Sequence, residues 1–355
     1  MTITITKDDI QNLLISVREL HGYIRKSVVS VCEANNASEQ GGNLQPISDL
    51  TSVDREASED TIYAIDCIGE QDIISGFTDI AQRHGALTLV GEGMPRDGLT
   101  LPSGTSPSAA RWRIIVDPID GTRGLMYQKR SAWILTGVAP NLGPDTNLAD
   151  LFLAVQTEIP LVKQHLCDTV WAIRGNGVNA VRYNRLTQTE SALRLTPSSA
   201  ISLRHGFATV ARFFPGAREL LGALDDKLFE NALGSTCDGR AISFEDQYIS
   251  SGGQLYELMA GHDRLVVDIR PLALQCLSPG RNIQSCAHPY DLCTEMIARE
   301  AGVVVCGVDG QSLRAPLDVT TPVGWVAYAN QQLKEQIHPL LLKAMERCGL
   351  RMNNI

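Results

Sequence analysis

The feature that most constrains this chain is an apolar strand that ends in two acidic residues around a tight turn. Residues 112–117 read Trp-Arg-Ile-Ile-Val-Asp, and residues 118–122 read Pro-Ile-Asp-Gly-Thr. A residue before proline favours extended backbone, so we expect Asp117 at the end of a strand. The proline also turns the chain so that Asp120 comes back toward Asp117, with the carbonyl of Ile119 between them. Because Pro-x-Asp-Gly is also ordinary turn chemistry, this segment alone favours a functional site only modestly.

The residues that close the turn suit an anion. Gly121 has no side chain to keep a phosphate from the backbone, and Thr122 can cap a following turn or helix. Free N–H groups at such a cap favour negative charge.

Two further carboxylates stand at positions where a ligand could be held. Glu92 follows the apolar strand Leu87–Val90 and has glycines on both sides. Asp291 follows His-Pro-Tyr and precedes a helical pattern that ends near Glu300. Each has an ordinary alternative, since Gly-Glu-Gly is a common turn and Asp is a common helix N-cap.

Composition limits the classes of protein that the chain can belong to. Its 355 residues carry a net charge of −9, which argues against a partner that is a nucleic acid polymer, because such binding needs clustered Lys and Arg. Nine cysteines without a CxxC pair indicate reduced thiols and predict a cytoplasmic protein. No stretch approaches the roughly 20 apolar residues of a membrane span, so we expect no membrane association.

Periodicity predicts a mixed α/β chain with a soft boundary near residue 195. The half at 1–195 is predicted to be α+β and to carry Glu92 and the 117–122 turn, whereas the half at 196–355 is predicted to be α/β and to carry Asp291. Helices are predicted at 8–32, 216–228, 251–261 and 291–301. Strands are predicted at 61–65 (delivering Asp66), 87–90, 112–117, 133–139, 151–156, 169–174, 264–268 and 303–306, with a hairpin at Gly175–Gly177.

Together these segments resemble the inositol monophosphatase family within the lithium-sensitive Mg²⁺-dependent phosphatases. That family carries Gly-Glu-Glu, Asp-Pro-Ile-Asp-Gly-Thr and Trp-Asp segments in this order, and here they read Gly91–Gly93, Asp117–Thr122 and Tyr290-Asp291. The resemblance implies a layered αβαβα sandwich and a phosphomonoesterase that hydrolyses a small phosphorylated polyol, sugar or nucleotide. It also implies a homodimer as the default assembly.

The resemblance also implies residue roles. One Mg²⁺ would be held by Glu92, Asp117 and the Ile119 carbonyl, and a second by Asp117, Asp120 and Asp291. A third, weaker ion would share Glu92. Asp66 and Thr122, with Glu92, would serve the attacking water, while Gly121 and Thr122 amides would hold the phosphate. Asp268 would contact substrate hydroxyls, and Arg123 would meet an additional phosphate or another anionic portion of the substrate.

Elementary electrostatics supports cations at such a cluster. Two unit charges about 4 Å apart repel by ~4 kcal/mol at an effective dielectric near 20, so converging carboxylates must hold protons or bind cations. A donor set of oxygens alone favours Mg²⁺, with Mn²⁺ as an alternative.

Several departures from the family leave alternatives open. Gly93 replaces the second Glu, Tyr290 replaces the Trp, and Arg123-Gly124 is closer to the Lys-Gly of bisphosphate nucleotidases. Extra length lies around 98–110, 140–150 and 269–287. The alternatives are a catalytically silent homologue that binds a phosphorylated ligand and, among enzymes, a fructose-1,6-bisphosphatase or a 3′-phosphoadenosine phosphatase.

Overall fold

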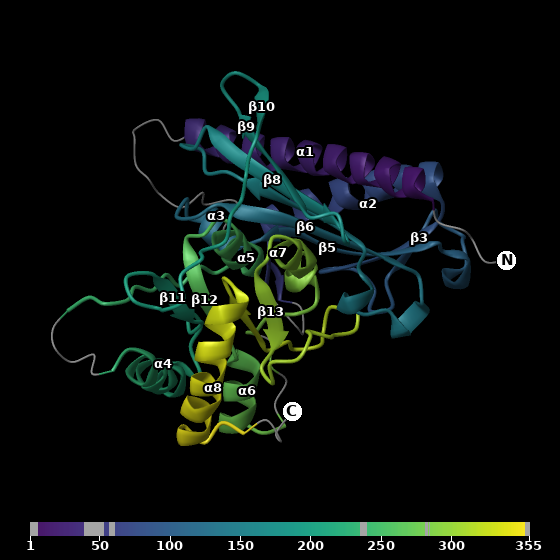
Figure 1. The fold of residues 1–355 in the computed structure, drawn as a ribbon. Helices are drawn as coiled ribbons and strands as arrows, with labels where there is room; N and C mark the ends of the chain where they lie inside the picture. Colours follow the sequence, from purple (N-terminus) through teal and green to yellow (C-terminus); the bar gives the residue numbers. More distant parts are fainter. Residues whose placement is uncertain are drawn as a thin grey trace.

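Five layers of secondary structure, helix–sheet–helix–sheet–helix, make up the chain (Figure 1). The computed structural model describes residues 6–38, 53–56, 61–234, 240–280, 283 and 285–351. Helices α1 and α2 lie on one side, α5 and α7 lie between the two sheets, and α4, α6 and α8 lie on the far side (Figure 1). The predicted α/β sandwich is confirmed.

The larger sheet comes from the first half of the chain and has eight strands in the order β10-β9-β8-β7-β6-β5-β3-β4. Its neighbours are antiparallel except for β3 and β5, which run parallel. The strands are β3 (Leu87–Gly91), β4 (Leu99–Leu101), β5 (Trp112–Asp120), β6 (Ala132–Pro140), β7 (Leu153–Ile159), β8 (Leu166–Ile173), β9 (Val178–Asn184) and β10 (Thr189–Ala192).

The smaller sheet has four strands in the order β11-β12-β14-β13. Strands β11 (Phe207–Val210) and β12 (Asp263–Asp268) are parallel, and β14 (Trp325–Tyr328) runs antiparallel to both β12 and β13 (Val304–Gly307). A separate two-stranded sheet joins β1 (Val53–Glu56) and β2 (Thr61–Tyr63).

Helices α1 (Lys7–Ser38) and α2 (Ala64–His84) cover one face of the larger sheet. Apolar residues at helical spacing in α1, such as Leu13, Val17 and Ile24, are fully buried against it. Among the buried polar residues of α1 is His21, whose ring bonds the hydroxyls of Thr157 (3.0 Å) and Thr136 (2.8 Å).

The middle layer joins the two sheets. It consists of α5 (Ser251–Met259), the short 3₁₀ helix η4 (Tyr290–Leu292) and α7 (Glu295–Glu300). Gln156 of β7 links both helices, donating to the carbonyl of Gly252 (2.8 Å) and accepting from the hydroxyl of Thr294 (3.0 Å). One continuous apolar core runs from the larger sheet through these helices into the smaller sheet.

The outer layer consists of α4 (Arg218–Leu233), α6 (Arg270–Leu277) and α8 (Gln331–Arg347). Helix α4 packs on β11, α6 and α8, and α8 also contacts β14. The extra length noted at 269–287 thus includes α6, whereas 140–150 forms two 3₁₀ turns, Gly143–Asp145 and Leu148–Asp150.

Two predicted elements differ from the structure. The strand expected at 61–65 ends at Tyr63, and α2 begins at Ala64, so Asp66 lies in the first turn of a helix rather than at a strand end. The helix expected at 291–301 is broken after η4, where Thr294 turns its hydroxyl to Gln156. The two sheets divide between Ala192 and Phe207; the domain boundary near 195 stays a prediction.

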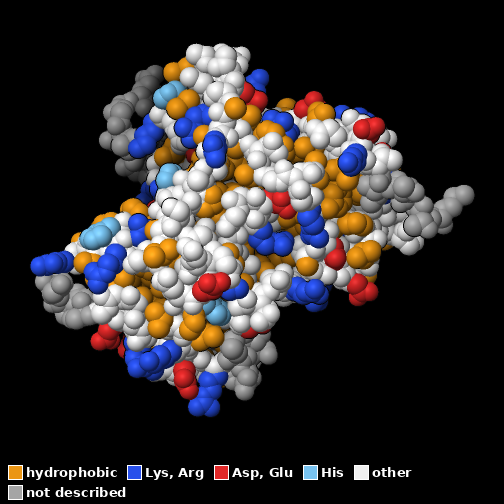
Figure 2. Space-filling view, viewed as in Figure 1, with side chains coloured by type: hydrophobic (Ala, Val, Ile, Leu, Met, Phe, Trp, Pro, Cys, Tyr) orange, Lys and Arg blue, Asp and Glu red, His pale blue; other side chains and the backbone are white. Residues whose placement is uncertain are grey.

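The visible surface mixes charges of both signs. Basic and acidic side chains alternate with apolar ones over the face in Figure 2, where the described residues show no large patch of one sign. Among the described helices, none has an apolar stretch long enough to cross a membrane.

Candidate active site

A bulge in β5 places Asp117 and Asp120 on the same face of the larger sheet. Three residues apart on a regular strand, they would point to opposite faces. Here Asp117 pairs with Leu135 and Asp120 with Trp133, so three steps on β5 match two on β6. The one additional residue reverses the alternation. Both carboxylates therefore face the middle helices, while the side chain of Ile119 packs into the core under α1 and α2.

The start of α5 holds Asp120. Its Oδ2 accepts hydrogen bonds from the Ser250 hydroxyl (2.7 Å) and the Gly252 amide (2.6 Å). Ser250 is also the N-cap of α5, since its Oγ accepts from the Gly253 amide (2.8 Å). One hydroxyl thus begins a helix and orients a carboxylate.

Gly121 lets the turn approach this loop. Its φ is 95°, in the left-handed region that favours glycine. A Cβ there would stand 3.1 Å from the Cβ of Ser250 and 3.3 Å from the carbonyl oxygen of Ile249. Close packing against the α5 loop is therefore a sufficient reason for glycine at this position.

Asp291 comes from the second half of the chain, on η4. Its Oδ2 accepts from the His288 amide (2.7 Å) and lies 3.7 Å from the Nδ1 of His288. Burial lowers the pKa of His288, but interactions with Asp291 and Cys286 raise it to about 10 overall. The protonated imidazole therefore offsets part of the acidic charge.

These three carboxylates converge. One oxygen from each of Asp117, Asp120 and Asp291 lies within 4.8 Å of the other two. Burial raises the pKa of Asp117, and repulsion from Asp120, Asp291 and Glu92 raises it further. Burial and Asp291 raise the pKa of Asp120 to about 7, although hydrogen bonds from Ser250 and Gly252 lower it. Glu92, which follows β3, adds to the repulsion on Asp117 but is not among the carboxylates whose oxygens lie within 4.8 Å of one another.

The cluster has the composition of a site for a hard divalent cation. Its ligands are all oxygens, as Mg²⁺ and Mn²⁺ prefer. Mg–O distances are about 2.0–2.1 Å, so two oxygens on one ion lie at most about 4.2 Å apart, and the three oxygens, within 4.8 Å of one another, would have to move little to close on an ion. A bound cation would remove the repulsion that otherwise keeps protons on these acids.

The other predicted residues lie around this cluster. The Thr122 hydroxyl donates to the carbonyl of Ile119 (2.8 Å), which leaves that oxygen a second lone pair. Arg123 lies in α3 (Thr122–Met126), with its guanidinium 5.1 Å from the ring centre of Phe214. Asp66 lies in α2, and its side chain lies outside the described part of the chain.

Asp268 is engaged in a buried ion pair. The side chain of Arg270 donates to both carboxylate oxygens, Nε to Oδ1 (2.8 Å) and Nη2 to Oδ2 (2.6 Å). Asp268 is fully buried, and the Arg270 guanidinium also lies 4.2 Å from the ring centre of Phe213. The substrate contact that we expect of Asp268 stays a prediction and would have to compete with this pair.

Sequence reasoning missed the residues that orient Asp120, which are Ser250 and Gly252. His288 is placed beside Asp291 by the sequence itself, and the structure shows its amide bonded to that carboxylate. The Ser-Ser-Gly-Gly run at 250–253 carries an N-cap signal for the helix, but its distance from Asp120 in the sequence hides the contact.

Comparisons with known proteins agree with this architecture. No family model matches this chain, and no curated protein matches it by sequence. Solved structures do match it. Fructose-1,6-bisphosphatase from Leishmania major aligns with a TM-score of 0.65 at 12% identity, covering 97% of this chain and 96% of that chain.

Two further structures give the same result. The extragenic suppressor protein suhB from Bartonella henselae has a TM-score of 0.58 at 14% identity, over 94% of this chain and 98% of that one. IMPase from Thermotoga maritima has a TM-score of 0.53 at 15% identity, over 85% and 93%. At these identities the likeness establishes the fold: this chain has the αβαβα fold shared by inositol monophosphatase and fructose-1,6-bisphosphatase structures.

Proposed function

We propose that the chain is a divalent-metal-dependent phosphomonoesterase that acts on a small phosphorylated polyol, sugar or nucleotide. The observation that carries this proposal is the meeting of Asp117, Asp120 and Asp291 within 4.8 Å, near Glu92. This cluster lies in a fold whose solved members include proteins described as inositol monophosphatase and fructose-1,6-bisphosphatase.

The acidic residues would hold Mg²⁺ or Mn²⁺. Glu92, Asp117 and the Ile119 carbonyl would form one ligand group, and Asp117, Asp120 and Asp291 would form a second, with Asp117 shared, as the resemblance implies. Such ions supply Lewis-acid activation of water and stabilisation of the leaving oxygen. The protein's part is to fix its carboxylates in place, which the bonds to Asp120 and Asp291 support.

The turn residues would position the substrate. The Gly121 and Thr122 amides, at the start of α3, would hold phosphoryl oxygens, and the Thr122 hydroxyl with Asp66 would orient the attacking water. Arg123 would meet a second anionic group of the substrate. These roles rest on the resemblance and on the closeness of the turn to the carboxylates.

A phosphate-release screen tests the proposal. We expect Mg²⁺-dependent turnover of at least one substrate among inositol phosphates, fructose bisphosphate and adenosine bisphosphates, with Li⁺ as the inhibitor to compare. Removing a group that only hydrogen-bonds a metal ligand typically lowers activity by roughly 10–100-fold. Asp117→Asn removes a ligand itself, so we expect a larger loss of turnover.

Asp145→Asn is the matched control, since Asp145 is exposed on the surface turn Gly143–Asp145. It should retain normal turnover. Near-normal activity in Asp117→Asn would refute the assignment. Phosphate-ligand binding without turnover by the unaltered protein would favour the silent homologue instead.

A further inference from the structure

A cavity of about 990 Å³ opens at one end of the smaller sheet. Its walls are the first turns of α6, the loop after β13 and the segment that leads into β14. This volume lies at the upper end of the roughly 300–1,000 Å³ of small-molecule sites. No carboxylate of the acidic cluster lines it.

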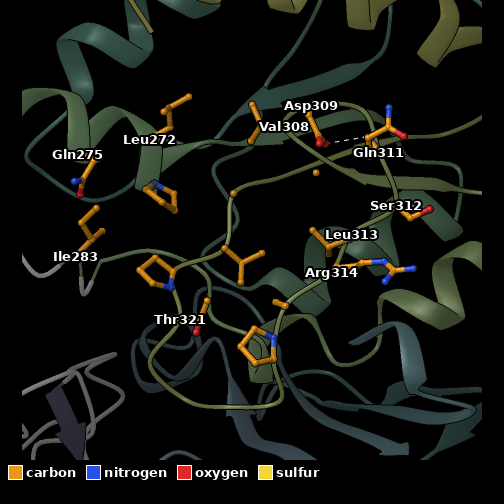
Figure 3. Close-up of a pocket in the computed structure, with 17 residues that line it drawn as sticks. Leu272, Gln275, Ile283, Val308, Asp309, Gln311, Ser312, Leu313, Arg314 and Thr321 are labelled. Carbon is orange, nitrogen blue, oxygen red and sulfur yellow. Dashed lines mark hydrogen bonds between the residues drawn. The ribbon is translucent and has the colours of Figure 1, made fainter. Parts of the chain in front are cut away.

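The two sides of the cavity differ in charge. Figure 3 shows the uncharged residues Leu272, Gln275 and Ile283 on one side, and Gln311, Ser312, Leu313 and the cation Arg314 on the opposite side. Apolar side chains supply most of the lining, including Pro271, Leu272, Val308, Leu313, Pro322 and Val323. The cavity can therefore receive an apolar body whose polar end points to the 311–314 side.

Charge selects the polar end of the ligand. Among the described residues that line the cavity, Arg314 is the only cation and Asp309 the only acid. Asp309 accepts a hydrogen bond from the Gln311 amide (2.9 Å), seen as a dashed line in Figure 3. Arg314 is exposed, and the described residues include no ion-pair partner for it. Its guanidinium suits a carboxylate or a sulfonate.

We propose that this cavity binds an amphipathic organic monoanion, with its apolar body against α6 and its anionic group at Arg314. Helix α6 belongs to segment 269–287, which is extra length relative to the family that the sequence resembles. One wall of the cavity therefore comes from this extra segment. The site adds a ligand that the proposed hydrolysis does not need, and its binding does not depend on that activity.

One backbone hydrogen bond joins the cavity wall to the segment that precedes Asp291. Val323, on its wall, donates its amide to the carbonyl of Ala287 (2.8 Å), the residue before His288.

Fluorescence titration of the full-length protein with 8-anilinonaphthalene-1-sulfonate tests the proposal. This probe has the required apolar rings and one sulfonate. We expect saturable binding at one site. Gln275→Trp, which places an indole in the cavity from α6, should abolish that binding, whereas Leu277→Trp, on the exposed side of the same helix, should leave it unchanged.

Charge is tested separately with Arg314→Gln. We expect about tenfold weaker binding of the sulfonate probe, as the loss of one charge-assisted contact implies. Binding of neutral N-phenyl-1-naphthylamine should stay unchanged. Lys343→Gln, a change of the same charge on the exposed face of α8, is the control.

The outcomes separate this site from the proposed active site. Asp117→Asn should lose turnover and still bind the probe at full affinity. Absence of saturable binding, or equal affinity in the unaltered protein, Gln275→Trp and Arg314→Gln at matched unfolding midpoints, would overturn the proposal. Loss of binding in Asp117→Asn would place the probe at the acidic cluster and overturn it as well.

Discussion

At the scale of single residues, the site depends on neutral hydrogen-bond donors as much as on its acids. Burial and the nearby Asp291 raise the pKa of Asp120 to about 7. The hydrogen bonds from Ser250 and Gly252 lower this pKa, so without them the carboxylate would be harder still to ionise. The Ser250 hydroxyl therefore acts on both the charge and the direction of Asp120.

Ser250→Ala removes this hydroxyl. We expect Mg²⁺ affinity to fall about 10–100-fold, because the pKa of Asp120 rises and its orientation is lost. The free energy of unfolding should fall by about 1 kcal/mol through loss of the α5 cap. Calorimetric Mg²⁺ titration and urea unfolding measure the two effects.

Ser250→Thr keeps the hydroxyl and should retain much of the Mg²⁺ affinity and of the unfolding free energy. If Ser250→Ala lowers stability but leaves Mg²⁺ affinity as it was, then the residue serves only as a helix cap.

At the scale of elements, α1 is fixed to the larger sheet through a histidine that has to stay neutral. Burial lowers the pKa of His21 to about 3, helped by Arg25. The ring bonds Thr136 and Thr157 on neighbouring strands and so sets the position of α1 on the sheet.

The stability of the protein should depend on pH through His21. Because the pKa of His21 is depressed in the folded state, the stabilisation that the neutral ring provides is complete above the unfolded-state pKa of 6.5. This stabilisation is lost as the pH falls toward about 3. Against His21→Gln, we expect the unfolding free energy of the unaltered protein to fall by an extra ~1.4 kcal/mol per pH unit below about 6. Urea unfolding between pH 7 and pH 4.5 measures the slope, and parallel curves for the two proteins would contradict the assignment.

Most elements could be predicted from local pattern, whereas their contacts could not. The alternation and apolar runs of β5 to β8 and the stripe of α1 are carried by neighbouring residues, so the sequence indicates them directly. The break after η4 lies instead where the Thr294 hydroxyl bonds Gln156, and the orientation of Asp120 depends on a hydrogen bond from Ser250. Both contacts join residues more than a hundred positions apart, which no local pattern encodes.

Acidic residues at the candidate site are predicted more easily than their surroundings. Asp117 and Asp120 bracket the Pro118-Ile119 turn, and Glu92 stands between glycines, so each carries a visible local signal. The engagement of Asp268 by Arg270 gives no such signal, because a nearby arginine is common and only the buried geometry shows the pair.

At the scale of the whole molecule, the carboxylates come from both halves of the chain. Asp117 and Asp120 belong to the larger sheet, and Asp291 belongs to the layer between the sheets. Without a cation, their repulsion opposes the packing of these layers, and a bound ion would reverse that effect.

Divalent cations should therefore stabilise the entire fold. At a free Mg²⁺ concentration of about 100 Kd, we expect a gain of about 2.7 kcal/mol in unfolding free energy. The gain should be larger at pH 8 than at pH 5.5, because Asp120, with a pKa of about 7, holds a proton that competes with the ion at the lower pH.

Differential scanning fluorimetry with a Mg²⁺ series at both pH values measures the gain. Asp291→Asn should remove most of it, and Asp145→Asn should leave it intact. A gain that is the same in all three proteins would place the ion elsewhere.

The bulge in β5 has a further consequence, for the kinds of genetic change that the site survives. Its two aspartates share a face only because an odd residue stands between their paired positions. Deleting Ile119 would leave the two aspartates two residues apart, which on a regular strand keeps them on one face, but it would remove the Ile119 carbonyl to which the Thr122 hydroxyl donates. Shortening this turn by one residue would therefore preserve the direction of the two acids and still take away the backbone oxygen that lies between them.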